Sequence, residues 1–139
     1  MYTVNKKIYF CYGHRLVNYS GKCKHLHGHD VVAEFLLGSE QLDERGMVID
    51  FSDIKQHIKQ WIDEHIDHKM LLYKNDPMVP VLQAEGEPLF LMDNNPTAEN
   101  IAKRLFEQAA SMDFPIIEVK LWETPTSCAA YSAEPMTAK

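Results

Sequence analysis

Residues 27–37 read His27-Gly-His-Asp-Val-Val-Ala-Glu-Phe-Leu-Leu37, and one side of this stretch is apolar, with Val31, Ala33, Phe35 and Leu37. Because side chains two residues apart share a face of an extended chain, this period predicts a β-strand with one buried face. His27 and His29 are in phase with the apolar residues. We therefore expect both imidazoles on the buried face, with Gly28 between them allowing a close approach.

Other parts of the chain show either the strand pattern or a helical one. The alternation of apolar side chains predicts further strands over residues 3–10, 116–123 and 128–132. Apolar residues at helical spacing predict a helix over residues 51–65. A second helix is expected to begin near Asn95-Pro96-Thr97, where proline and capping residues give a start signal.

The predicted order ββααββ indicates an α+β domain, with two helices on one face of an antiparallel sheet. Residues 72–95 hold several prolines and are predicted as one long loop, a length typical of segments that serve a site. The 139 residues suffice for a single domain spanning 1–139. Four strands leave open sheet edges, so we expect closure by homo-oligomerisation.

Composition and charge exclude several classes of protein. The net charge of −6 argues against a nucleic-acid partner. No apolar run approaches the roughly 20 residues of a membrane span, and the N-terminal residues do not read as a signal peptide, so a soluble, cytoplasmic protein is expected. The chain has three cysteines, Cys11, Cys23 and Cys128, and such a small, odd number does not indicate a disulfide framework.

The basic residues of the first part of the chain are unbalanced by acids. Residues 1–29 contain no Asp or Glu, and their cations are Lys6, Lys7, Arg15, Lys22 and Lys24. Such clustering is either a solvated face or a local anion site suited to phosphate on an otherwise acidic protein.

A third histidine completes a metal-ligand pattern. His14 continues the phase of Ile8 and Phe10 beyond the first strand, and adjacent antiparallel strands can bring it to His27 and His29. Three imidazoles with one open position is the pattern of catalytic zinc. At this stage His25, which shares the parity of the pair, is a rival ligand, and Cys23 leaves a closed structural zinc site open as the alternative.

Several blocks of sequence resemble the family of the 6-pyruvoyl-tetrahydropterin and 6-carboxytetrahydropterin synthases. They cover nearly the whole chain in the family's order: Phe10-Cys-Tyr-Gly-His14, Cys23-Lys-His-Leu-His-Gly-His29, Gly46-Met-Val-Ile-Asp-Phe51, Ile66-Asp-His-Lys69, Asn95-Pro-Thr-Ala-Glu-Asn-Ile-Ala102 and Leu121-Trp-Glu123. The family has a small residue where this chain has Tyr12, which predicts a pocket of altered shape.

The resemblance implies a fold, a cofactor and an assembly. It implies the tunnelling fold (T-fold), whose subunits associate into a barrel, commonly as a trimer or a dimer of trimers, with active sites between subunits. It also implies Zn²⁺ on His14, His27 and His29. The implied substrate is a pterin triphosphate, 7,8-dihydroneopterin triphosphate.

The resemblance implies catalytic roles for Cys23, Asp67 and His68, with Cys23 moving protons and the other two assisting it. Glu123 ends the apolar face of its predicted strand, where an acid is costly unless paired. The resemblance implies that Glu123 binds the amino-pyrimidinone edge of the pterin. Thr97 and Glu99 would complete the pocket, with Thr97 also a candidate helix cap.

The triphosphate is assigned to basic residues near the histidines, Arg15 and Lys24 among them. The resemblance favours the carboxy branch of the family, which releases acetaldehyde and triphosphate, leaves a 6-carboxyl group on the pterin and feeds queuosine synthesis. The alternatives are the pyruvoyl branch, which eliminates triphosphate, a non-catalytic zinc and pterin binder, and a purine-binding relative.

Overall fold

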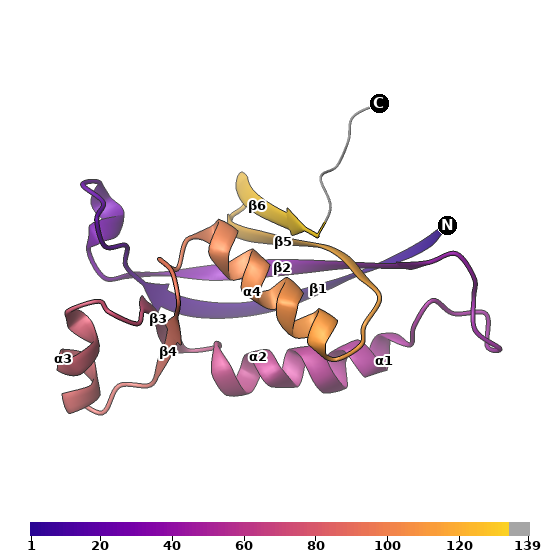
Figure 1. The fold of residues 1–139 in the computed structure, drawn as a ribbon, viewed down its shortest axis with the longest axis horizontal. Helices are drawn as coiled ribbons and strands as arrows, with labels where there is room; N and C mark the ends of the chain where they lie inside the picture. The colour runs from indigo at the N-terminus through magenta and orange to yellow at the C-terminus, as the bar shows by residue number, and fades with distance from the viewer. Residues whose placement is uncertain (134–139) are drawn as a thin grey trace.

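The computed structural model describes residues 1–133, and the last six residues of the predicted domain lie outside this range. One six-stranded sheet runs through the molecule in the order β4-β3-β1-β2-β5-β6. The strands are β1 (Tyr2–His14), β2 (His27–Ser39), β3 (Lys69–Tyr73), β4 (Leu89–Met92), β5 (Ile116–Thr124) and β6 (Ser127–Ser132). Strands β1 and β2 are the longest and cross nearly the whole molecule (Figure 1).

The β1–β2 pair is the frame on which the rest of the fold is built. The two strands are antiparallel and paired along their whole length, from Tyr2 opposite Ser39 to His14 opposite His27. Side chains from one face of both strands are buried, among them Ile8, Phe10, Val31, Ala33, Phe35 and Leu37. The period-two pattern therefore predicted the correct buried face, and both strands extend a few residues beyond the predicted bounds.

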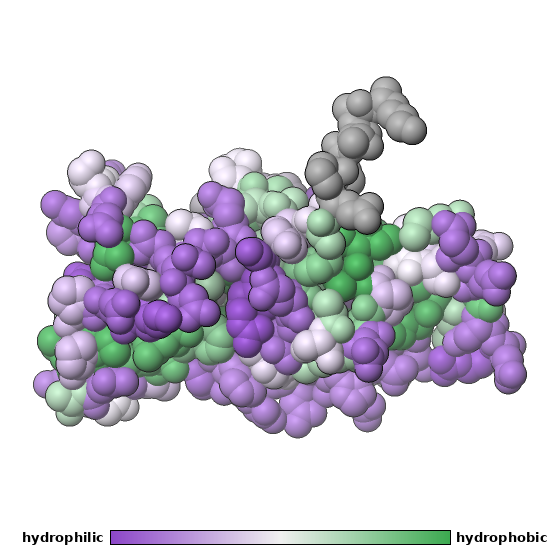
Figure 2. All heavy atoms as spheres, in the orientation of Figure 1, coloured by the Kyte–Doolittle hydropathy of each residue, from purple (hydrophilic) through white to green (hydrophobic). Residues whose placement is uncertain are grey.

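Helices cover this buried face. A first helical stretch consists of α1 (Phe51–Ile54), a π-helical turn (Lys55–Lys59) and α2 (Gln60–His65), and it places Ile54, Ile58 and Ile62 in the core. The second long helix, α4 (Ala98–Ser111), adds Ile101 and Leu105. The outward sides of α2 and α4 are mainly hydrophilic (Figure 2), as expected of amphipathic surface helices.

The prediction of one long loop over residues 72–95 was wrong. The segment contains the end of β3, the helix α3 (Met78–Ala84) and the strand β4, with β3 parallel to both β1 and β4. The sheet is therefore mixed rather than purely antiparallel, and a third helix joins the two predicted ones. These elements are only four to seven residues long, so each is too short for its apolar period to stand out.

The α+β class and the arrangement of the helices against the sheet agree with the prediction. Among residues 1–133, no helix has the length and apolar character needed to cross a bilayer. Among residues 1–133, the N-terminal part of β1 pairs only with β2, because β3 reaches β1 only at Tyr12, Gly13 and His14. Within the same described range, β6 at the other end of the sheet pairs only with β5.

Candidate active site

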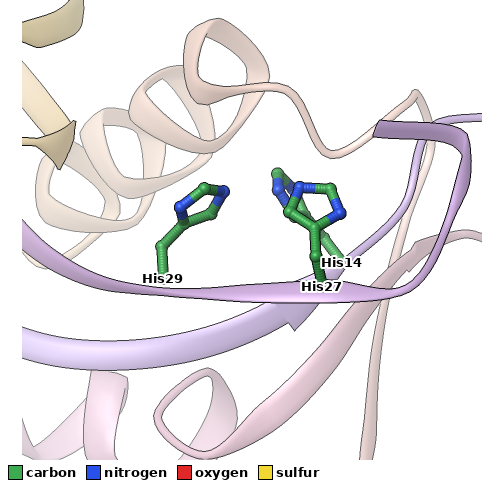
Figure 3. A group of neighbouring side chains, drawn as sticks. All are labelled: His14, His27 and His29. Atoms are coloured by element: carbon green, nitrogen blue, oxygen red, sulfur yellow. The ribbon is translucent and has the colours of Figure 1, made fainter. Parts of the chain in front are cut away.

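Three histidines meet where β1 ends and β2 begins. Register places His14 directly opposite His27, and His29 lies two residues further along β2 on the same face. One ring nitrogen from each residue lies within 4.8 Å of the others, and the ring centroids are 4.5 to 5.1 Å apart. Figure 3 shows the rings of His27 and His29 rising from one strand toward that of His14. The sequence-predicted ligands are thus brought together.

Hydrogen bonds define the tautomer of two of these rings. Nδ1 of His14 donates to the carbonyl of Pro96 at 2.7 Å, and Nδ1 of His27 donates to the carbonyl of His25 at 2.7 Å. A neutral imidazole that donates through Nδ1 carries a lone pair on Nε2. Such bonds from the outer nitrogen are the usual support of a metal-ligating histidine.

The two Nε2 atoms have no hydrogen-bond partner among the described residues, although both are buried. Burial also lowers the pKa of His14, which favours the neutral ring that a metal requires. Buried acceptors of this kind are costly unless something satisfies them. The arrangement therefore fits a divalent cation held by three imidazole nitrogens, and His25, whose carbonyl orients His27, supports that ring through its backbone.

Glu123 lies against the same cluster. Its Oε2 is 3.5 Å from Nε2 of His14 and 3.6 Å from Nε2 of His29. A cation or a proton between the carboxylate and these two imidazoles would make the contact attractive. Glu123 is in phase with the buried Val119 and Leu121 on β5, and it lies where the pairing of β5 and β6 shifts register between Trp122 and Thr124.

Tyr12 is the functional neighbour that sequence reasoning left without a role. Its hydroxyl donates to Oε2 of Glu123 at 2.6 Å, and its ring is buried with 2% of its surface exposed. Burial, together with the charge of Glu123, raises the pKa of Tyr12 well above its usual range, so the hydroxyl remains a donor at neutral pH. Tyr12 lies two residues before His14 on β1, so the two side chains share a face of the strand, and this spacing was the feature of the sequence that could have indicated its place in the site.

A cavity of about 550 Å³ opens beside the histidines, within the size range of small-molecule sites. Its walls include His14, His29, Glu123, Cys23, Thr97 and Glu99. Cys23 comes from the 3₁₀ turn Lys22–Lys24. Cys128, at the start of β6, also lines the cavity. The structure thus brings the predicted catalytic cysteine, two of the predicted metal ligands and the predicted pterin-pocket residues to one cavity.

Thr97 has a structural role as well. It is the N-cap of α4, and its hydroxyl accepts a hydrogen bond from the N–H of Asn100 at 3.2 Å. The same turn carries Pro96, whose carbonyl holds His14. The start of α4 is therefore coupled to the orientation of a metal-ligand candidate.

Asp67 and His68 do not reach this cavity within one chain. Asp67 accepts a hydrogen bond from the N–H of Cys11 at 3.0 Å and contacts Nδ1 of His68 at 2.9 Å. Partial burial opposes ionisation of Asp67, but these contacts outweigh it and lower its pKa. The pair lines a different hollow, together with Tyr9 and Cys11. Its walls share no residue with those of the histidine cavity.

The basic residues differ in availability. Arg15 forms a two-pronged ion pair with the buried carboxylate of Asp76, with Nε donating to Oδ2 at 2.8 Å and Nη2 donating to Oδ1. This pair uses the fork of nitrogens with which a guanidinium would bind phosphate. Lys24 is exposed on the turn that carries Cys23.

In an α+β domain, a mixed sheet brings three imidazoles and one carboxylate together beside a cavity, an arrangement that could hold a metal ion. Comparison with known proteins adds the family. Residues 3–134 match the family described as 6-pyruvoyl tetrahydropterin synthase, and the chain belongs to this family.

Curated relatives carry a more specific name. The chain is 39% identical over 132 residues to a 6-carboxy-5,6,7,8-tetrahydropterin synthase of Rickettsia conorii, covering 90% of this chain and 96% of the relative. It is 40% identical over 126 residues to the protein of that name in Aquifex aeolicus, covering 81% and 77% of the two chains.

Solved structures share the fold. An uncharacterised protein of Wolinella succinogenes superposes with a TM-score of 0.81 at 27% identity, over 96% of this chain and 98% of that one. The 6-pyruvoyl tetrahydropterin synthase of Caenorhabditis elegans gives a TM-score of 0.71 at 26% identity, over 96% of each chain. The predicted family fold is thereby confirmed for the single subunit.

Proposed function

We propose that the chain is a zinc-dependent synthase that converts 7,8-dihydroneopterin triphosphate to 6-carboxy-5,6,7,8-tetrahydropterin, with release of acetaldehyde and triphosphate. The observation that carries this proposal is a cluster of three imidazoles beside a cavity that Glu123 and Cys23 line. The name shared by the curated relatives supports the carboxy branch. The same product would serve queuosine synthesis.

The proposed metal site consists of His14, His27 and His29. Bound zinc would act as a Lewis acid toward the oxygens of the substrate side chain. The hydrogen bonds to Pro96 and His25 hold two of the rings with Nε2 turned inward. Two rigid strands and the start of α4 therefore set the ligand geometry before any ligand binds, which reduces the cost of ordering it.

Glu123 is the proposed anchor for the pterin. A carboxylate can accept two adjacent N–H donors, and the amino-pyrimidinone edge of a pterin offers such a pair. Its carboxylate stands beside His14 and His29, so a ring held there would carry its side chain near the histidines. Thr97 and Glu99 lie on the wall of the same cavity and would border the ring.

Proton transfer to and from the substrate is assigned to Cys23, with assistance from Asp67 and His68. Cys23 lies on the cavity wall, whereas the other two line a separate hollow of the same chain. The assistance would therefore come from a second copy. An ionised Asp67 that contacts Nδ1 of His68 would fix the tautomer of that imidazole, as carboxylates do in catalytic triads.

Sheet topology supports this shared site. Because β1, β2, β5 and β6 are successively antiparallel, β6 runs opposite to β1, and its first residues lie at the end of the sheet where β1 finishes. Joining the open edge of β6 to the open part of β1 in another copy would extend the sheet. The partner's Asp67, which binds the β1 backbone at that end, would then approach the cavity wall formed by Ser127 and Cys128.

The triphosphate would lie toward the exposed Lys24, where the local sequence carries no acid. Arg15 could bind the triphosphate only if its guanidinium contacted Asp76 and the phosphate together, or if the ion pair with Asp76 broke. Lys24 is therefore the stronger of the two candidates, since no neighbouring carboxylate would have to be displaced.

Product analysis tests the proposal directly. Zinc-loaded protein incubated with 7,8-dihydroneopterin triphosphate should give 6-carboxytetrahydropterin and acetaldehyde in equal amounts, measured by mass spectrometry. A pyruvoyl product without acetaldehyde would instead assign the sister activity, which the family description and the Caenorhabditis elegans neighbour favour. Substrate binding without turnover would leave a pterin-binding protein.

Cys23→Ala separates an enzyme from a binder. It should abolish turnover while zinc content and pterin binding persist, because the thiol is assigned to proton transfer alone. His57→Ala, at an exposed helix position outside both clusters, is the matched control. Full turnover by Cys23→Ala would remove the cysteine from the mechanism.

A further inference from the structure

We propose that Tyr12 is a positioning residue for Glu123, fixing the carboxylate that receives the pterin. The inference rests on the proposed function, because it assigns Glu123 to the ligand. It goes beyond that function because Tyr12 does not itself line the cavity and acts through its hydrogen bond to Glu123.

The geometry singles out one hydrogen bond. Tyr12 lies opposite His29 in the β1–β2 register, so its ring stands on the buried face beside the histidines. Its centroid is 5.2 Å from that of His14 and 6.2 Å from that of His29, both in edge contacts. From this packed position the hydroxyl reaches Oε2 of Glu123 at 2.6 Å, the short distance of a charge-assisted bond.

Glu123 needs such support because its backbone gives it little. It lies at the bulge between β5 and β6, and 21% of its side chain is exposed. Oε2 is the oxygen near His14 and His29. Without a fixed partner the carboxylate would be free to turn about its side-chain torsions, and ordering it for the pterin would cost binding free energy.

The Tyr12 hydroxyl counters this by donating to Oε2, which fixes the plane of the carboxylate. Oε1 has no hydrogen-bond partner among residues 1–133 and remains available to the pterin N–H groups. The bulky side chain at this position thus contributes a hydrogen-bond donor to Glu123.

Tyr12→Phe removes the hydroxyl and keeps the packed ring. Binding of 7,8-dihydroneopterin to the zinc-loaded protein, measured by titration calorimetry, should weaken about tenfold or more, the usual effect of losing a hydrogen bond to a charged group. Zinc content should stay unchanged. Tyr131→Phe is the matched control, because Tyr131 packs on Phe106 away from the cavity, and its binding constant should not change.

A double-mutant cycle separates positioning from general damage. In the Glu123→Gln background, Tyr12→Phe should weaken binding by less than about twofold, because the partner of the hydroxyl is already altered. An equal loss in both backgrounds, unchanged binding in Tyr12→Phe, or loss of zinc from it would each overturn the role assigned here. If the unaltered protein binds no dihydroneopterin, the proposed function fails and takes this inference with it. Binding by the unaltered protein that Tyr12→Phe retains in full overturns the inference alone.

Discussion

Nδ1 of His14 donates a hydrogen bond over 2.7 Å to the carbonyl of Pro96, which joins the end of β1 to the residue before the cap of α4. The two residues are far apart in sequence, yet this contact determines which nitrogen of His14 faces its neighbours. The metal-type site is therefore built on the sheet and the second long helix together. Changes at the start of α4 should reach the histidines through it.

Removing one imidazole should abolish tight metal binding without unfolding the chain. His29→Ala is the suitable change, because His29 is only partly buried whereas His14 lies in the core. Zinc affinity should fall by more than about 100-fold, since altering even the outer support of a ligand costs 10- to 100-fold. Metal analysis after dialysis measures this, with His57→Ala as the control and circular dichroism to check folding. Retention of one zinc per chain by His29→Ala would exclude it as a ligand.

The cap of α4 should contribute measurably to stability. Thr97→Ala removes the acceptor for the N–H of Asn100 and should lower the free energy of unfolding by about 1 kcal/mol. Thr97→Ser keeps an acceptor hydroxyl and should cost much less. Urea denaturation at a fixed chain concentration gives both values. Equal stability of the alanine and serine variants would show that the hydroxyl does not cap the helix.

The Arg15–Asp76 pair should make part of the stability depend on pH. The hydrogen bond with Arg15 outweighs burial and lowers the pKa of Asp76 below its ordinary value of 3.8. The contribution is therefore complete above 3.8 and is lost as the pH falls from there through the lower pKa of the folded state.

Asp76→Asn tests this contribution. At neutral pH it should reduce the free energy of unfolding by about 1 to 3 kcal/mol, because a buried charged partner of Arg15 is lost. The difference from the unaltered protein should shrink at acid pH, when measured by urea denaturation across a pH series. A difference independent of pH would mean that the ionised carboxylate is not what stabilises the fold.

Complementation should reveal a site shared between copies. Cys23→Ala and His68→Ala should each be inactive alone. Co-refolded in equal amounts, they should recover about a quarter of full turnover, because a random pairing at a head-to-tail interface restores both residues at one contact in four. No recovery in mixed oligomers would place Cys23 and His68 in the same subunit's site.

Much of this architecture follows from local patterns in the chain. The alternation around His27 gave the correct buried face because β1 and β2 are long and fully paired, so their apolar period is uninterrupted. The His14, His27 and His29 cluster follows from the same register. Short elements behave differently. β3 and β4 are specified by parallel pairing with distant segments, which no local period encodes.

Contacts between distant side chains explain the remaining differences. Tyr12 and Glu123 are 111 residues apart in sequence, and only the order of β1, β2 and β5 in the sheet brings them together. Asp76, the partner of Arg15, likewise lies in the turn between β3 and α3, within the region predicted as one long loop. The basic character of Arg15 was visible in sequence, but its partner was not.

The open three-histidine site can be tested by X-ray absorption at the zinc edge, on zinc-loaded protein with and without 7,8-dihydroneopterin. We expect three imidazole nitrogens and one light ligand whose signal changes when the pterin binds. A sulfur neighbour at about 2.3 Å, or a fourth protein ligand that the pterin leaves untouched, would contradict an open three-histidine site.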